Sequence, residues 1–490
     1  MTKQLRSLQF ILLLVPLTFT LFLFWKFLLL WQVPFRLDYA EGFVYFNSVR
    51  ILEGQAIYHS ITNPPHVPGF YTPVYFSSLA SLMVLFGERI EIGRLLSFAC
   101  YLSSAILVSL IVFQFCKSKF LSIFAGLLFT SSLIISLWAF VIRPDMLAIA
   151  IVLLGILYGA TKKLDRWYDL PLIALVFALA FFTKQNLVLA PAAVAIWLLL
   201  TCRRKGITFV FLYGLFVLIG VAVFSYWTDG SFFQQTFLYA GKVEYSNWYP
   251  ALRVALITIL STLPFFAIAT AASLRKPREL SSIYFFVSLL GFFTLIREGG
   301  TINYLLEFVP ALIIRSASSD IWFKYLFRWN VLAYLLVVVV LVSQLFSSFS
   351  VFPWELKNFR TEKTRFFEAE KKLIISTSGE VLAEDAFLPI AAGKKVFIEP
   401  FTFGQVTGSL LVSPKVFYND LDSGKYELVI EQGAFRNVPD FYEHLEPRFE
   451  LVYKAKAERK IKGFDYSLYN LNQYSGFGEV YQFAAKKEQN

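Results

Sequence analysis

The sequence predicts a polytopic membrane protein whose membrane part is all α-helical and which ends in a smaller α/β domain. Of its 490 residues, 57% are hydrophobic and only 16% are charged, whereas soluble domains carry about 25% charged residues. The hydrophobic residues come in long runs, and a run of about 20 apolar residues spans a bilayer as a helix. After residue 351 the composition becomes mixed and polar.

The net charge of +11 does not indicate a nucleic-acid-binding surface. The basic residues cluster in short turns between apolar runs, which is the pattern of cytoplasmic loops in membrane proteins. The three cysteines, Cys100, Cys116 and Cys202, lie in or at the ends of apolar runs. They imply no disulfide framework, and no Cys/His spacing typical of a metal site is present.

The first apolar run, residues 8–31, is too long for the core of a signal peptide and has no small-residue cleavage site. We therefore expect it to be retained as the first span. Lys3 and Arg6 precede it, which predicts a cytoplasmic N-terminus. Residues 32–93 then form the first outer loop.

Within that loop, the apolar stretch 74–86 is about 20 Å long as a helix, which is short for a crossing. Thr72 is a candidate cap, Pro73 suits a first turn, and Gly87 suits the end of the helix. We expect this helix to lie at the membrane interface. Counting it as a span would break the alternation of basic and less basic turns.

About eleven crossings are expected in total, with basic turns alternating between the two sides. Several of these segments are near 15 residues, which is tolerable around a wet cavity. After the first run, the expected spans are 94–116, 120–141, 145–160, 168–182, 187–202, 207–227, 251–272, 281–296, 301–314 and 330–350.

Residues 1–351 are therefore expected to form the transmembrane domain, and residues 352–490 an extracytoplasmic α/β domain. Three segments, "KKVFIEP", "KYELVI" and "FELVYKA", have the pattern of short strands. The segment "EKTRFFEAEKKLI" has the pattern of an amphipathic helix. The tail "AAKKEQN" is expected to fray.

The polar residues that interrupt the apolar pattern converge on the outer face in this topology. Charged groups at membrane depth are costly, and they usually face a cavity, form pairs and mark function. These residues are Asp38, Glu41, Arg143, Asp145, Lys184, Gln185, Arg297, Glu298, Asn303 and Glu307.

Structural roles explain several of these residues equally well. Asp38 and Glu41 have the spacing of a capping box that begins a helix at "GFVYFNSVRIL". Arg143 and Asp145 flank a proline and would pair within a turn between two helices. The stretches "TKQN" and "REGG" are also compatible with plain polar turns.

The order of segments resembles a known family. It runs from a first span through the acidic motif to "RILEGQAIY", "YTPVYFSSLASLMVLFG" and "GRLLSFACYLSSAIL", and later to "RPDMLAIAIVLLG", "FFTKQNLVLAPAAV" and "GGTINYLLEFVPAL". This is similar to GT-C membrane glycosyltransferases, a group that includes family 39 protein mannosyltransferases and the aminoarabinose transferase of lipid A. The resemblance covers most of residues 8–350. Many relatives have adjacent acids where this chain has "DYAEG".

The resemblance implies transfer of a sugar from a polyprenyl-phosphate or diphosphate donor to a lipid, glycan or protein acceptor outside the cytoplasm, with inversion at the anomeric carbon. Asp38 matches the catalytic acid of the family and would act as the general base. Glu41 or Asp145 would orient the acceptor. The leaving phosphate requires positive charge, for which Arg143, Lys184 and Arg297 are available.

The remaining expected substrate contacts are Gln185, Asn303, Glu307 and Tyr71, the last stacking on a sugar. A divalent ion held by Asp38 and Asp145 would be an alternative to cationic side chains. We favour the cations, with no metal and no other cofactor.

Two other classes of function compete. A secondary transporter or lipid flippase would also use buried acids, but the sequence shows no inverted repeat. An O-antigen ligase or polymerase would share lipid-linked chemistry, but it typically places a large loop between late spans. The expected location is the plasma membrane.

Overall fold

The structure is a computed structural model. It describes residues 3–241, 248–297, 302–320, 322, 338–339, 341–342, 353–447, 449–454 and 479–483. Most of the span expected at 330–350, and the C-terminal tail, lie outside these residues.

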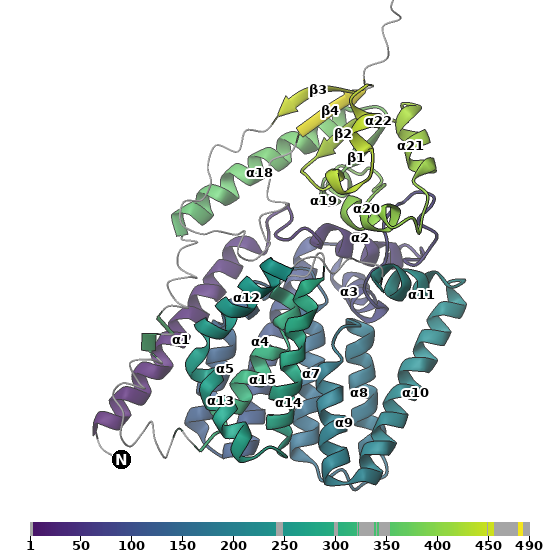
Figure 1. Ribbon diagram of the computed structural model, residues 1–490. Helices are drawn as coiled ribbons and strands as arrows, with labels where there is room; N and C mark the ends of the chain where they lie inside the picture. Colours follow the sequence, from purple (N-terminus) through teal and green to yellow (C-terminus); the bar gives the residue numbers. More distant parts are fainter. Residues whose placement is uncertain are drawn as a thin grey trace, which may run out of the picture.

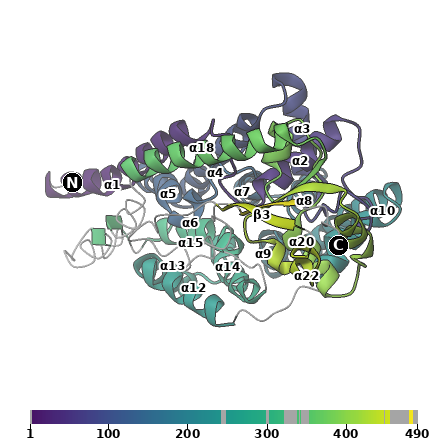
Figure 2. The ribbon, with the colours of Figure 1, turned by 90° about the horizontal axis from the view of Figure 1, so that it is seen from above.

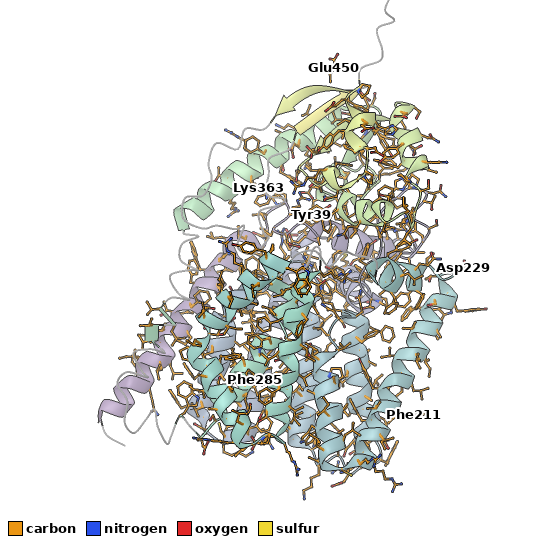
Figure 3. All side chains as sticks on the ribbon, in the orientation of Figure 1. Tyr39, Phe211, Asp229, Phe285, Lys363 and Glu450 are labelled. Carbon is orange, nitrogen blue, oxygen red and sulfur yellow. The ribbon has the colours of Figure 1, made fainter. Side chains whose placement is uncertain are left out.

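The body of the protein is a bundle of helices that run roughly side by side, with α1 slanting away from the others (Figure 1). Long hydrophobic side chains cover its outer surface. Phe211 on α10, for example, is 65% exposed and points away from the bundle in Figure 3. The helices of the bundle are α1 (Lys3–Leu30), α4 (Ile90–Cys116), α5 (Lys119–Ser131), α6 (Leu133–Ser136), α7 (Asp145–Thr161), α8 (Asp169–Thr183), α9 (Leu189–Thr201), α10 (Arg203–Trp227), α13 (Leu263–Arg275), α14 (Leu280–Ser288) and α15 (Phe308–Ala317).

Shorter elements cover one end of the bundle, opposite the end at which the N-terminus lies (Figure 1). The helix expected at 74–86 is α3, which ends before Gly87 at a positive φ of 88°. Thr72 precedes it as expected, but its hydroxyl donates to the Phe181 carbonyl and accepts no backbone N–H of the helix. The covering elements are α2 (Glu41–Leu52), α3 (Pro73–Phe86), α11 (Ser231–Phe233), the π-helix η1 (Gln234–Tyr239) and α12 (Trp248–Ser261).

Three helices within the described residues have the length and composition needed to cross a membrane, namely Gln9–Leu30, Ile90–Cys116 and Arg203–Trp227. The expected span 251–272 is bent by 82° between α12 and α13, and counting the pair as one crossing gives a fourth. The expected span 301–314 is also interrupted, because a 3₁₀ turn, η3 (Ile302–Leu305), precedes α15. A second 3₁₀ segment, η2 (Leu289–Ile296), continues α14. Eleven crossings therefore stay a prediction.

The described residues from 353 onward lie on the covered end of the bundle, and we call them the C-terminal layer (Figures 1 and 2). In Figure 1, helix α18 lies above the end of α1 that is farther from the N-terminus. The elements of the layer are α18 (Pro353–Ser376), β1 (Glu380–Ala383), α19 (Phe387–Ala391), α20 (Pro400–Gly408), α21 (Lys415–Asp422), β2 (Tyr426–Glu431), η5 (Phe435–Asn437), α22 (Phe441–Leu445), β3 (Phe449–Lys454) and β4 (Glu479–Phe483).

The four strands form a sheet in the order β1-β2-β4-β3. β1 and β2 are parallel, and both other pairings are antiparallel. The predicted strands "KYELVI" and "FELVYKA" correspond to β2 and β3, and the predicted amphipathic helix lies within α18. The prediction for "KKVFIEP" was wrong. Within the described residues, this segment makes an isolated bridge between Ile398 and His66, which lies between α2 and α3, because its neighbour is that connection and not the sheet.

Candidate functional site

Asp38 lies in the short connection between α1 and α2, at the covered end of the bundle. The backbone N–H of Ala40 donates to its Oδ1 at 3.1 Å. Helix α2 begins only at Glu41, with Ala40 as N-cap and no side-chain cap, so the capping box that the spacing suggested does not form. The Asp38 carboxylate is 12% exposed, and Arg143 donates to it from Nη1 at 2.7 Å.

Arg143 connects the two acids of the site. Its Nε lies 3.3 Å from Oδ2 of Asp145, and its Nη2 donates to the Tyr71 hydroxyl at 2.6 Å. The guanidinium carbon is 4.7 Å from the centre of the Trp138 ring, which is a cation–π distance. These contacts hold the guanidinium between Asp38 and Asp145. Trp138 was not singled out from the sequence, although it stands in the same irregular segment before α7.

Asp145 begins α7, where the helix dipole favours a negative charge. Lys184, in the turn after α8, donates to its Oδ1 at 2.5 Å, and Asn303 donates to the same oxygen at 3.3 Å. The charges therefore alternate along a row, from Asp38 to Arg143, Asp145 and Lys184. We call these four residues the charge row.

Burial and the neighbouring charges affect the two cations differently. Burial lowers the pKa of Lys184 below its ordinary 10.5, although the Asp145 carboxylate opposes this. Burial also disfavours the charge on Arg143, but Asp38, Tyr71 and Asp145 together hold its pKa well above the ordinary value. Arg143 is thus a permanent cation at the site, whereas the Asp145 carboxylate favours the charged form of Lys184 against its burial.

Glu41 is not part of the charge row. From the sequence, Glu41 was expected to orient the acceptor at the reaction site. Its side chain is fully buried. Arg94 binds both of its oxygens, and the backbone N–H groups of Leu37 and Ile142 donate to it at 2.5 and 2.9 Å. Its lone pairs are therefore occupied within the fold. Arg94 was missed as a site residue, although a lone arginine at the start of an apolar span was a visible signal.

Three of the other expected substrate contacts have hydrogen-bond partners outside the charge row. Gln185 donates to the Phe70 carbonyl at 2.7 Å, and Arg297 donates to the Ala240 carbonyl at 2.6 Å. Glu307 is buried and accepts from the backbone N–H of Ala190, so it caps the start of α9. Their roles in substrate binding stay predictions, and Glu298 lies outside the described residues.

A cation of the chain itself bridges the two carboxylates of the site. Asp38 and Asp145 both bind Arg143, whose guanidinium occupies the position between them. Within the described residues, no group of three or more His, Cys, Asp or Glu is arranged to hold a metal ion.

Known proteins share this architecture. The family model described as dolichyl-phosphate-mannose-protein mannosyltransferase matches residues 67–227. The structure is similar to that of ArnT from Cupriavidus metallidurans bound to undecaprenyl phosphate, with a TM-score of 0.60 and 13% sequence identity over 97% of this chain and 98% of that chain. It is also similar to the apo oligosaccharyltransferase of Archaeoglobus fulgidus, with a TM-score of 0.52 and 10% identity over 90% of this chain and 71% of that chain. No curated protein matches the chain.

The helical bundle, the charged cluster at one of its ends and the layer above that cluster define a GT-C fold. The family model matches residues 67–227, and the two structures show that the chain shares the fold of these membrane glycosyltransferases.

Proposed function

We propose that this protein transfers a sugar from a polyprenyl-phosphate-linked donor to an acceptor hydroxyl, on the side of the membrane where the C-terminal layer lies. The observation that carries the proposal is the pairing of Asp38 with Arg143 in a partly exposed site at the end of the bundle. A base and a phosphate-binding cation, which are the two groups that the reaction requires, are in contact there. The undecaprenyl phosphate bound to the similar ArnT structure supports the class of carrier.

In the proposed reaction, the acceptor oxygen attacks the anomeric carbon while the bond from that carbon to the phosphate oxygen breaks. The acceptor proton passes to the Asp38 carboxylate, and the phosphate leaves with the bonding electron pair. Attack opposite to the leaving group inverts the anomeric carbon. Arg143 and Lys184 stabilise the charge that develops on the leaving oxygen, and Asp145 holds both cations in place.

A membrane bundle suits this chemistry because the polyprenyl tail of the donor stays in the bilayer while its phosphate reaches the interface. The side of the membrane on which the covered end of the bundle lies is proposed from the sequence. The basic turns, for example Arg203 to Lys205 before α10, follow helices that start at the site, so they lie at the opposite end. The N-terminus would then be cytoplasmic, and the site and the C-terminal layer extracytoplasmic.

The decisive experiment uses purified protein in proteoliposomes with a panel of polyprenyl-phosphate sugars and acceptors extracted from the envelope. Wild-type protein is expected to release polyprenyl phosphate and to form a glycosylated product, and Asp38→Asn is expected to abolish both while inserting normally. Asp165→Asn is the matched control, because Asp165 pairs with Lys205 in an exposed turn far from the site. Movement of the lipid-linked sugar across the bilayer with no sugar transfer would overturn the proposal in favour of a flippase.

A further inference from the structure

The connection that carries Asp38 has two faces. Asp38 and Glu41 bind the helical bundle through Arg143 and Arg94. The residues between and before them face the other way, because Arg36 and Tyr39 bind the C-terminal layer. Figure 3 shows Tyr39 at the junction of the bundle and the layer. The acid proposed as the base is therefore held between two contacts made by its near neighbours.

The first contact joins Arg36 to the ends of two parallel strands. Its Nη2 donates to Oε1 of Glu384 at 3.0 Å and to Oε1 of Gln432 at 2.6 Å. Glu384 directly follows β1, and Gln432 directly follows β2. The other carboxylate oxygen of Glu384 accepts the backbone N–H groups of Gln432 and Ala434, at 2.8 and 2.7 Å. Asp385 lies 3.8 Å from Nε of Arg36. The sheet therefore fixes the position of the guanidinium.

The second contact joins Tyr39 to the start of α20. The Tyr39 hydroxyl donates to Oε1 of Glu399 at 2.6 Å. Glu399 caps α20 by accepting the N–H groups of Phe401 and Thr402, at 3.2 and 2.9 Å. Its own N–H donates to the carbonyl of His66 in the first outer loop at 3.0 Å. The Tyr39 ring is thus held by a carboxylate that is itself fixed to a helix.

Helix α2 also approaches the layer directly. A Cβ added to Gly42 would lie 3.2 Å from the Cβ of Ala386 and 3.3 Å from its backbone nitrogen. Arg36, Glu384, Asp385 and Glu399 are each at most 5% exposed. Buried charge-assisted hydrogen bonds of this kind fix geometry more tightly than contacts at a wet surface.

We propose that the C-terminal layer positions the catalytic base, with Glu384 acting through Arg36 and Glu399 acting through Tyr39. This inference rests on the proposed function. A displacement of about 1 Å at a reacting group can reduce a rate by about 10²-fold. The two contacts lie two residues before Asp38 and one residue after it, which leaves the connection little freedom to move.

The kinetic test compares Tyr39→Phe, Glu399→Leu and Arg36→Met with the wild type in the sugar-transfer assay. A positioning role is expected to lower kcat by roughly tenfold or more while the KM for the donor stays within about twofold, because donor binding uses other residues. Arg36→Lys is expected to restore part of the rate. Asp422→Asn is the control, since Asp422 pairs with His444 at the surface of the same layer. Wild-type kcat in all three variants would overturn the inference.

A substrate-free measurement separates this inference from the proposed function. A spin label is attached at Ala40→Cys after Cys100 is replaced by Ala, and Cys116 and Cys202 by Ser. The label is expected to become more mobile when Tyr39→Phe or Arg36→Met is added, and to be unaffected by Asp422→Asn. Unchanged mobility in both variants would overturn the positioning role. If the wild type transferred no sugar from any donor, the proposed function would fail, while the label would still report on the two contacts.

Discussion

Glu41 and Arg94 form an ion pair in which both side chains are fully buried, with 3.2 Å between Oε2 and Nη2. Arg94 also donates to the backbone carbonyls of Val33 and Phe35, at 2.6 and 2.8 Å. One arginine on α4 therefore holds both the chain that leaves α1 and the first residue of α2. The pair therefore fixes the connection that carries Asp38 against helix α4.

Removing one member of this pair is expected to destabilise the protein strongly. In Glu41→Gln the buried guanidinium loses its counter-charge, which typically costs about 3–5 kcal/mol. The midpoint of thermal unfolding in detergent should fall for Glu41→Gln and for Arg94→Met. The double variant should be more stable than Arg94→Met alone, because it contains no unpaired buried charge. Equal or lower stability of the double variant would contradict this account.

Arg143→Lys is expected to impair catalysis more than folding. A lysine supplies one point charge and cannot reach Asp38, Tyr71 and Asp145 together. We expect kcat/KM for the donor to fall by roughly 10²-fold, as for the loss of one donor that stabilises developing charge. Initial rates at saturating acceptor measure this effect, and the unfolding midpoint serves as the control. A variant with wild-type rates would remove Arg143 from the proposed chemistry.

Lys184→Met is expected to slow transfer from the donor in two ways. It removes a cation from the site, and it changes the position of Arg143. The loss of Lys184 leaves Asp145 with Arg143 as its remaining charged partner within the described residues, which draws the guanidinium away from Asp38. We expect kcat/KM for the donor to fall by roughly tenfold or more. Adding Asp145→Asn should recover part of the loss, since it frees Arg143. Strictly additive losses in the double variant would show that the two residues act independently.

The stability of the C-terminal layer is expected to depend on pH through Glu399. Burial raises the pKa of this carboxyl from 4.5 to about 7, and the nearby Glu384 adds to the rise. The hydrogen bonds from Tyr39 and from the backbone N–H groups of Phe401 and Thr402 oppose this rise. Between these values the unfolded chain has lost its proton while the folded protein keeps it. Stability should therefore fall as pH rises from about 4.5 to 7, by roughly 3 kcal/mol.

Thermal unfolding between about pH 5 and 8 tests this dependence. Glu399→Gln is expected to flatten the part of the pH profile that Glu399 contributes, because glutamine does not titrate. Glu450→Gln is the control, since Glu450 is exposed on β3 and points away from the layer in Figure 3. A profile that is equally steep in Glu399→Gln and in the wild type would refute the prediction.

The sequence was enough to predict a helical membrane protein with the GT-C fold and to identify Asp38, Arg143, Asp145 and Lys184 as candidates. Apolar runs and the cost of charge at membrane depth act locally along the chain, so both signals are visible without a structure. Helix continuity was less predictable. The bend between α12 and α13 and the 3₁₀ turn before α15 lie inside apolar stretches that read as continuous spans.

The tertiary structure alone decided how the two acids of the opening motif divide their roles. Asp38 and Glu41 are three residues apart, yet one faces a partly open site and the other is buried against Arg94. The structure also brought Arg36 to Glu384 and Tyr39 to Glu399, across 348 and 360 residues of chain. Nothing in the local sequence specifies such partners, because they are selected by the packing of the C-terminal layer onto the bundle.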